Sequence, residues 1–352
     1  MVDQRYHFAN YPLLFNVGCF VMDFLKCKPL LGTSPNPNPN PNLQSSDQGS
    51  ATITALIVVG VVAVLLAGLM WRQQIQIRSL ENARDRVQAQ WLQRAAIDFA
   101  RLVLVEDQRN SQIDHLGEAW ALPLADGKVA DFLKNADVPD EISTVTLRGQ
   151  LTDAQGQFNL TNLWDKDFGT INVAGVQQYG RLLDALGLDR GLAQQTAQGI
   201  LQSDMPVYDL DGLLRLPFYN QTILEKIRPF VSILPNITTV NVNTAPTEVL
   251  MAAIPGLSRT AATNFVQQRS TTPLKSADEI TTLLNKAGGS TGTTIDASLI
   301  DVRSQFWLAR SEIHLGRGIF TSSALIQRSQ TPLPSGNFTQ VIWSRTGKIA
   351  AE

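Results

Sequence analysis

The chain has little cysteine, and this shortage excludes several kinds of chemistry. Its only two cysteines, Cys19 and Cys27, both precede Gly49. A product that begins at Ser50 therefore has no disulfide, no thiol nucleophile and no cysteine ligand for a metal. Such a product can fold in an oxidising compartment without forming disulfides.

Histidine and positive charge are also scarce. The 352 residues include three histidines, which lie far apart in the sequence and so disfavour a zinc site or an acid–base cluster. The formal net charge is −2, and it stays −2 without residues 1–49, because that segment carries three basic and three acidic side chains. No basic field is available to attract nucleic acid.

Residues 1–49 do not resemble a domain. Four Pro-Asn pairs occupy residues 35–42, a repeat that cannot form a helix and favours extended, solvated chain. We interpret 1–49 as a leader or disordered extension that is removed. An alternative is that translation starts later, at Met22.

One apolar run dominates the rest of the N-terminal region. Ala51 to Met70 supplies 20 residues, mostly apolar and without a charge. At about 1.5 Å per residue, such a helix reaches the ~30 Å hydrocarbon thickness of a bilayer. The sequence therefore predicts a transmembrane helix over 50–70. Basic residues lie on both sides of the run, so the positive-inside rule does not orient it.

The residues after Met70 continue with helical spacing. Neither glycine nor proline occurs from Leu69 to Asn110, so we expect one continuous helix of about 55 residues rather than two. Its apolar positions form one stripe, which we expect to pack partly on the protein's own sheet and partly on partners. The stripe comprises Ile77, Leu80, Val87, Trp91, Ala95, Phe99 and Leu102.

Two regions have the pattern of strands. Residues 142–160 alternate apolar and polar side chains around a turn signal at 153–156, which predicts a hairpin. Residues 304–329 break at Gly316-Arg317-Gly318, and 338–345 follow, which predicts three more strands. Between these regions, 165–300 consists mostly of short helical segments.

These patterns predict an α+β fold with a long membrane-inserted N-terminal helix and an antiparallel sheet. An all-helical domain that contains a segment like a helix-hairpin-helix is inserted into the sheet. The expected divisions are a leader at 1–49, the membrane helix at 50–70, the rest of the helix and the first strands at 71–164, the helical insert at 165–300, the returning strands at 301–345 and a tail at 346–352.

One motif resembles that of a hydrolase. Residues 288–292 match G-x-S-x-G, with Ser290 at its centre, and Asp296 or Asp301 and then His314 follow in the order of hydrolase triads. The nucleophile requires a strained turn between a buried strand and a helix. Here an apparent helix precedes the motif, so we interpret the segment as a loop.

Two further motifs suggest ligands. Asp209-Leu210-Asp211-Gly212, with Asp204 nearby, resembles half of a calcium loop, but the closing glutamate is missing. Residues 254–280 resemble a helix-hairpin-helix, which in nucleic-acid binders offers backbone amides to phosphate. The basic residues there are Arg259, Arg269 and Lys275, so few phosphate contacts are expected.

Taken together, the chain resembles the minor pseudopilin K family of bacterial type II secretion. The resemblance rests on Gly49 before an apolar helix, LTDAQGQFNLTNL at 151–163, VNVNTAPTEVLMAAIPGL at 240–257 and the strands that resume at 304. It covers about residues 49–345. The leader is longer than is usual in the family, and the acidic loop at 202–208 is shorter.

The resemblance implies that the antiparallel sheet is pilin-like and that the function is without catalysis. A prepilin peptidase would cleave after Gly49, and the new amine of Ser50 would be methylated. The globular part would lie in the periplasm, anchored in the inner membrane, and would cap a pseudopilus together with the minor pseudopilins I and J. Calcium bound by Asp204, Asp209 and Asp211 is a further implication, and no nucleic acid is expected.

Thr54, the fifth residue after the expected cleavage site, agrees with a position at the tip. Most pilin-like subunits have glutamate there, and a carboxylate in hydrocarbon requires a neighbouring amine. A subunit with nothing above it has no such amine to neutralise. The alternative function is a membrane-anchored periplasmic nucleic-acid binder that uses the hairpin at 254–280.

Overall fold

The computed structural model describes residues 48–128, 144–165, 168–202, 209–276, 279–280 and 298–347. The chain divides into two units, Met1–Arg72 and Gln73–Glu352. The α-helices are α1 (Gln48–Asn110), α4 (Val173–Ala185), α5 (Leu192–Gln202), α6 (Gln221–Ile227), α7 (Thr247–Ala253) and α8 (Arg259–Thr271). The longer strands are β1 (Leu124–Lys128), β2 (Thr146–Asp153), β9 (Phe306–Leu315), β10 (Gly318–Arg328) and β11 (Thr339–Thr346).

Short elements connect these. The 3-10 helices are η2 (Ala119–Ala121), η3 (Ala154–Gly156), η4 (Leu160–Leu163), η5 (Leu210–Arg215) and η6 (Arg228–Phe230). The two-residue strands are β3 (Phe158–Asn159), β4 (Trp164–Asp165), β5 (Thr170–Ile171), β6 (Val231–Ser232), β7 (Val240–Asn241) and β8 (Ile300–Asp301). They pair as β3 with β6, β4 with β5, and β7 with β8.

The expected continuous helix is confirmed. Helix α1 has 63 residues without interruption, because the sequence from Leu69 to Asn110 contains no residue that breaks a helix. It ends beside Asn110, and the following loop carries Asp114, whose backbone N–H donates to the carbonyl of Val302 at 2.9 Å. The end of α1 is thereby tied to a segment almost 190 residues later.

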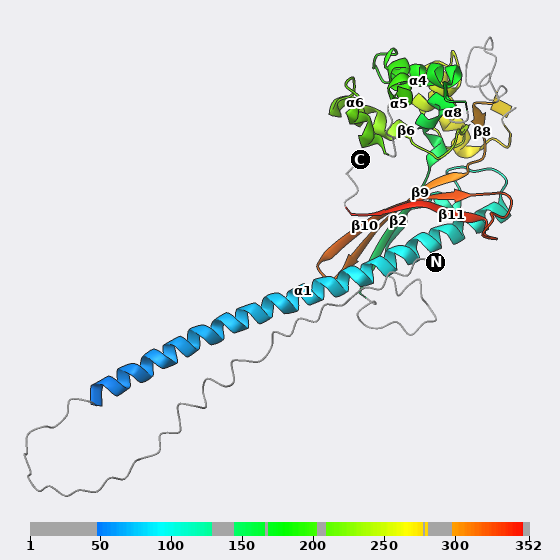
Figure 1. The fold of residues 1–352 in the computed structure, drawn as a ribbon. Coiled ribbons are helices and arrows are strands. Elements are labelled where there is room, and N and C mark those ends of the chain that lie inside the picture. The colour runs from blue at the N-terminus through cyan, green and yellow to red at the C-terminus, as the bar shows by residue number, and fades with distance from the viewer. Residues whose placement is uncertain are drawn as a thin grey trace, which may run out of the picture. The chain divides into compact units, whose positions relative to one another are not determined.

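The sheet has the order β1-β2-β9-β10-β11, and all its pairings are antiparallel. Alternate residues of β9 are buried against α1 (Figure 1): Trp307 and Ala309 form a cluster with Ala100 and Leu104. The three strands expected after 304 are confirmed. Strands β2 and β9 pair although the whole helical region separates them in sequence.

The hairpin predicted for 142–160 is wrong. Residues 154–156 form η3, and the chain then leaves the five-stranded sheet, because β3 pairs in parallel with β6. Phe158 and Leu160, which continue the alternating pattern, are fully buried in the core of the helical region. The alternating pattern of 142–160 therefore reflects burial in two different cores, first that of the sheet and then that of the helical region.

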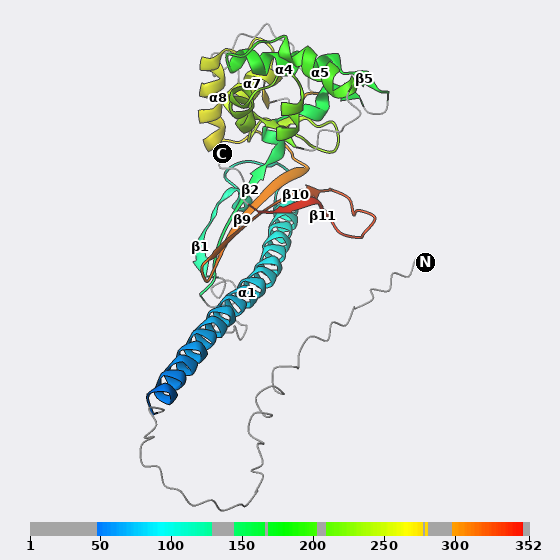
Figure 2. The same cartoon turned by 60° about the vertical axis from the view of Figure 1, so that its left-hand side comes forward.

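Helices α4, α5, α7 and α8 surround that second core (Figure 2). Its centre includes Tyr179 and Leu182 from α4 and Phe265 from α8, each 0% exposed. Helix α4 approaches η4 closely at Gly175, where an added Cβ would lie 1.9 Å from the carbonyl oxygen of Asn162. Only glycine permits this approach.

Candidate functional site

The N-terminal part of α1 carries an exposed apolar surface. The large apolar residues from Ile53 to Met70 are between 46% and 72% exposed. Among the described residues, one helix is long and apolar enough to cross a membrane, judged by length and composition. Gly49 and Ser50 lie in its first turn, and Thr54 is an exposed position on it. Such a surface requires lipid or a protein partner.

Within residues 73–110, α1 has two different faces. The face on the sheet carries Ala89, Gln93 and Ala100, which are 1%, 5% and 8% exposed, and one large apolar residue that is 0% exposed, Leu104. The opposite face carries the larger side chains, such as Trp91, which is 66% exposed. Ala100 follows Trp91 by nine positions, which is about two and a half turns at about 100° per residue. The two side chains therefore point to opposite sides of the helix.

The predicted packing of the apolar stripe on the sheet is therefore wrong. Ile77, Leu80, Val87, Trp91, Phe99 and Leu102 are between 46% and 73% exposed. Alanine allows the helix to approach the strands closely, so the face on the sheet has few bulky side chains. The named stripe is instead an exposed surface of the folded chain.

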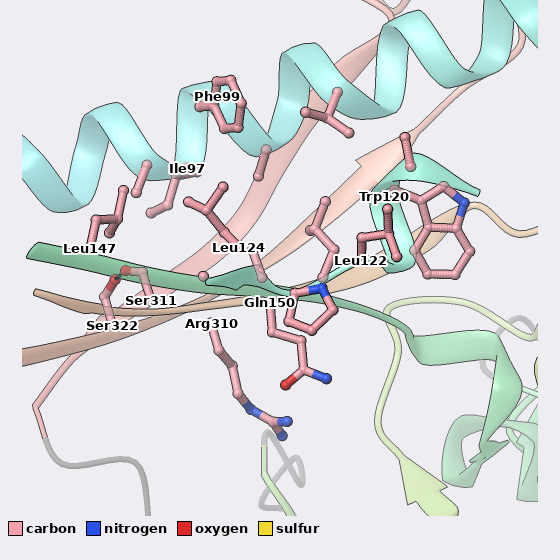
Figure 3. A pocket seen from close by; sticks show the side chains of 18 residues that line it. Ile97, Phe99, Trp120, Leu122, Leu124, Leu147, Gln150, Arg310, Ser311 and Ser322 are labelled. Atoms are coloured by element: carbon pink, nitrogen blue, oxygen red, sulfur yellow. Dashed lines mark hydrogen bonds between the residues drawn. The ribbon is translucent and has the colours of Figure 1, made fainter. Parts of the chain in front are cut away.

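A cavity of about 340 Å³ lies between α1 and the sheet. Figure 3 shows Phe99 and Ile97 from α1 above Leu124 of β1 and Leu147 of β2. Arg310 is the one ionisable side chain among the described residues that line it. The lining thus offers apolar contact, and no acid–base pair is present among those residues.

The strings at 151–163 and 240–257 lie in one connected region. Asn162 donates from Nδ2 to the carbonyl of Thr238 at 2.8 Å and accepts from the Thr238 N–H at 3.0 Å. Asn159 donates to the carbonyl of Asn236 and accepts from the N–H of Leu234. These amide side chains satisfy backbone groups of irregular chain that would otherwise be buried without partners.

Asn241 lies at the centre of this region and is 0% exposed. Its Nδ2 lies 2.9 Å from Asp153 Oδ2, 2.9 Å from Ser304 Oγ and 3.1 Å from the carbonyl oxygen of Asp114. Asp153 also accepts from Thr244 Oγ1 at 2.6 Å. Burial raises the pKa of Asp153, and hydrogen bonds from Ser304 and Thr244 oppose that shift.

A second motif residue fixes the other side of the string. Asn243 donates to the carbonyl of Leu274 and accepts from its N–H, both at 3.0 Å. Arg269 of α8 donates to the carbonyls of Val242 and Ala245, and burial lowers its pKa to about 10. The string at 240–257 is therefore a structural connector between the sheet and the helices.

Arg328 of β10 holds the end of α1. Its guanidinium lies 2.8 Å from Asp107 Oδ2 and 2.5 Å from Asp114 Oδ1, and it stacks 4.1 Å from the ring centre of Trp307. Burial raises the pKa of Asp114 to about 7, and Arg328 opposes the shift. The pKa of Asp107 is raised by burial and by the charge of Glu118.

A helical hairpin is present, but its first helix is α7, which precedes the expected range 254–280, and its second is α8. Gly256, in the turn between them, has a φ of +76°. Arg259, however, contacts Glu248 Oε1 at 2.6 Å and the carbonyl of Ala185 at 2.8 Å. Arg259 and Arg269 are thus both engaged within the protein, and they are two of the three basic residues of this range. The geometry does not favour that hypothesis.

The predicted calcium ligands do not form a carboxylate set among the described residues. Asp209 caps η5 through the N–H of Gly212 and lies 3.3 Å from Arg345, and Asp211 lies 2.5 Å from Arg228. Asp204 lies outside the described residues, so calcium there stays a prediction.

The hydrolase motif also lies mostly outside the described residues, since these include neither Ser290 nor Asp296. Of its possible partners, Asp301 is 3.7 Å from Arg303, and His314 Nε2 is 2.6 Å from Glu312 on the same strand. The first contact lies just before β9, and the second lies on β9 itself.

Sequence reasoning missed Asp107, Asp114, Glu118 and Arg328. Their side chains meet only in the fold, because Asp114 and Arg328 are 214 residues apart. Each is a single charged residue in an otherwise ordinary segment, so no local spacing pattern indicates the cluster.

The long helix, the antiparallel sheet and the inserted helices define a pilin-like protein of the α+β class. The model of the family "Type II secretion system (T2SS), protein K" matches residues 240–303, which include the string around Asn241. The type II secretion system protein K of Pseudomonas aeruginosa is 30% identical over 307 residues, covering 78% of this chain and 86% of the relative. The chain belongs to the type II secretion protein K family, whose members are minor pseudopilins and structural components of secretion.

A solved structure confirms the fold. In the crystal structure of the GspK-GspI-GspJ complex from enterotoxigenic Escherichia coli, one chain matches with a TM-score of 0.57 and 20% identity. The match covers 78% of the present chain and all of that chain. The long apolar N-terminal helix of the present chain fits a membrane-anchored pseudopilin.

Proposed function

We propose that this chain caps the tip of the type II secretion pseudopilus together with the minor pseudopilins I and J. The observation that carries the proposal is the exposed apolar face of α1, which persists on the folded domain beyond the membrane segment. A face of this kind suits partner helices packed side by side. The solved relative is itself a complex of three pseudopilins.

The anchor would lie in the bacterial inner membrane, with the globular part in the periplasm. A prepilin peptidase would cut between Gly49 and Ser50 and leave an amine for methylation. Lack of cysteine after that point suits an oxidising compartment. The role would be structural and not enzymatic, which agrees with the apolar lining of the cavity between α1 and the sheet.

The direct test replaces Gly49 with tryptophan. A bulky side chain should block the peptidase, so we expect Gly49→Trp to remain at full length on immunoblots and to stop secretion in a strain that lacks the native gene. Mass spectrometry of the wild-type chain should find a methylated N-terminal Ser50.

Ser45→Trp is the matched control, since it adds the same bulk four residues upstream. It should be processed like wild type. Normal processing and secretion of Gly49→Trp would refute the proposed maturation and, with it, the pseudopilin role that depends on an amine at Ser50.

A further inference from the structure

Three carboxylates meet where α1 ends. Asp107 lies in the last turn of α1, Asp114 in the following loop and Glu118 directly before η2. One oxygen of each lies within 4.8 Å of the other two. Their side chains are 8%, 2% and 9% exposed. Such close carboxylates repel one another unless a positive charge or a proton lies between them.

Glu118 has an oxygen without a hydrogen bond. Its Oε2 accepts from the N–H of His115 at 3.0 Å and from Trp120 Nε1 at 2.8 Å. Its Oε1 is buried and accepts no hydrogen bond. His115 Nε2 lies 3.7 Å from Oε1, beyond hydrogen-bond distance. A buried carboxylate oxygen without a hydrogen bond leaves a place for a water molecule or an ion beside it.

The charges around the cluster do not balance. Arg328 contacts both Asp107 and Asp114, but it supplies one positive charge against three carboxylates. The ionised cluster therefore carries a net charge of about −2, and burial makes such a charge unfavourable. One divalent cation would neutralise it.

We propose that Asp107, Asp114 and Glu118 bind a hard divalent cation of the calcium type. Calcium takes oxygen ligands at about 2.3–2.6 Å, so two ligands on opposite sides of one ion are about 5 Å apart. Oxygens within 4.8 Å of one another fit around such an ion. A set made only of carboxylates favours calcium, magnesium or manganese over softer metals.

This site is separate from the loop at 202–211, where the resemblance places calcium. The cation would tie the last turn of α1 to the loop before η2 and, through Arg328, to β10. The inference does not depend on the proposed tip position, because binding is measured on the isolated chain.

The test uses the purified full chain in detergent, first treated with a chelator, and titrates calcium by calorimetry. In Glu118→Gln the charge is lost, but the amide oxygen can still accept from His115 and Trp120, so the fold is kept. We expect the wild type to bind one calcium ion that Glu118→Gln loses or binds at least tenfold more weakly. Asp107→Asn should behave in the same way.

Glu106→Gln is the matched control, because Glu106 is one residue from Asp107 but 60% exposed. It should bind calcium like wild type. Terbium offers a local readout: Trp120 lies beside Glu118, so excitation of tryptophan should sensitise terbium emission in the wild type and much less in Glu118→Gln.

The outcomes separate the two sites. If the loop at 202–211 binds an ion of its own, Glu118→Gln loses one ion of two, and the inference stands. If Glu118→Gln retains every ion at the wild-type affinity, or if the wild type binds none, the proposed site is wrong.

Discussion

The amide of Asn241 joins three parts of the chain at once. It contacts Asp153 at the end of β2, Ser304 before β9 and the carbonyl of Asp114 after α1. All of these groups are buried, so none can exchange a lost hydrogen bond for water. An unsatisfied buried polar group costs about 1–3 kcal/mol, which makes this residue more demanding than its size suggests.

Replacing Asn241 with alanine should therefore lower stability considerably. We expect Asn241→Ala to reduce the free energy of unfolding by about 2–4 kcal/mol, because it leaves Asp153 and the Asp114 carbonyl short of a donor. Chemical denaturation of the full chain in detergent, followed by circular dichroism, measures the change.

Gln267→Ala is the control for this substitution. Gln267 is an exposed residue of α8, and its loss should change the free energy by less than about 0.5 kcal/mol. Equal effects of the two substitutions would show that Asn241 does not hold the connection between β2, β9 and the loop after α1.

Sequence alone indicated the string that contains Asn241 but not the role of the residue. Its partners Asp153 and Ser304 lie 88 and 63 residues away, and their own segments resemble an ordinary turn and an ordinary strand start. Hydrogen bonds between distant segments produce no periodic pattern in the sequence. Burial of one face of a helix or strand does produce such a pattern.

At the scale of elements, the sequence pattern predicted the length of α1 correctly but not which of its faces packs on the sheet. The absence of helix breakers correctly predicted one long helix. The largest apolar residues, however, did not mark the face on the sheet, because close packing there uses Ala89 and Ala100. A row of large apolar side chains predicts that a helix face packs on something. It does not show whether the partner is the protein's own sheet or another subunit.

The strands divide in the same manner. Strands β9, β10 and β11 were predicted from the sequence pattern. The turn between β9 and β10 is part of that pattern, at Gly316, which has a φ of +57°. The hairpin at 142–160 failed because β2 pairs with β1 and β9 and not with the residues that directly follow it. A strand that pairs across an inserted domain gives no local signal of its partner.

The two faces of α1 should respond differently to substitution. Trp91→Gln changes a residue that is 66% exposed, so we expect a change in stability below about 0.5 kcal/mol. Ala100→Phe overfills the face on the sheet and should cost about 1–3 kcal/mol. Thermal unfolding of both variants measures the contrast.

Trp91→Gln should nevertheless recover less of the minor pseudopilins I and J in co-purification, since it removes a large apolar contact. Val105→Gln offers a comparison on a half-buried position nearer the end of α1. If Trp91→Gln is as unstable as Ala100→Phe, or if it recovers both partners normally, the exposed face does not mediate association.

At the scale of the whole molecule, one chain combines a long apolar helix with a sheet in which the helical region separates the neighbouring strands β2 and β9 in sequence. Strand β2 pairs with β9, while the residues between them form their own core. The string at 240–257 then returns the chain to the sheet through Asn241 and Ser304. The helical region thus adds a second core between two strands that are neighbours in one sheet.

The proposed tip position can be tested at Thr54. A glutamate there would lie in the apolar segment and would need the N-terminal amine of a subunit above it. At the tip no such subunit exists, so Thr54→Glu should cost about 1–3 kcal/mol in insertion and assembly. Because about 1.4 kcal/mol corresponds to a factor of ten, we expect the assembled complex with I and J to fall roughly tenfold.

Thr54→Val, which keeps the shape without the charge, should assemble normally. Full assembly and secretion by Thr54→Glu would mean that a neighbouring amine does pair with it, which places the subunit within the fibre and not at its end.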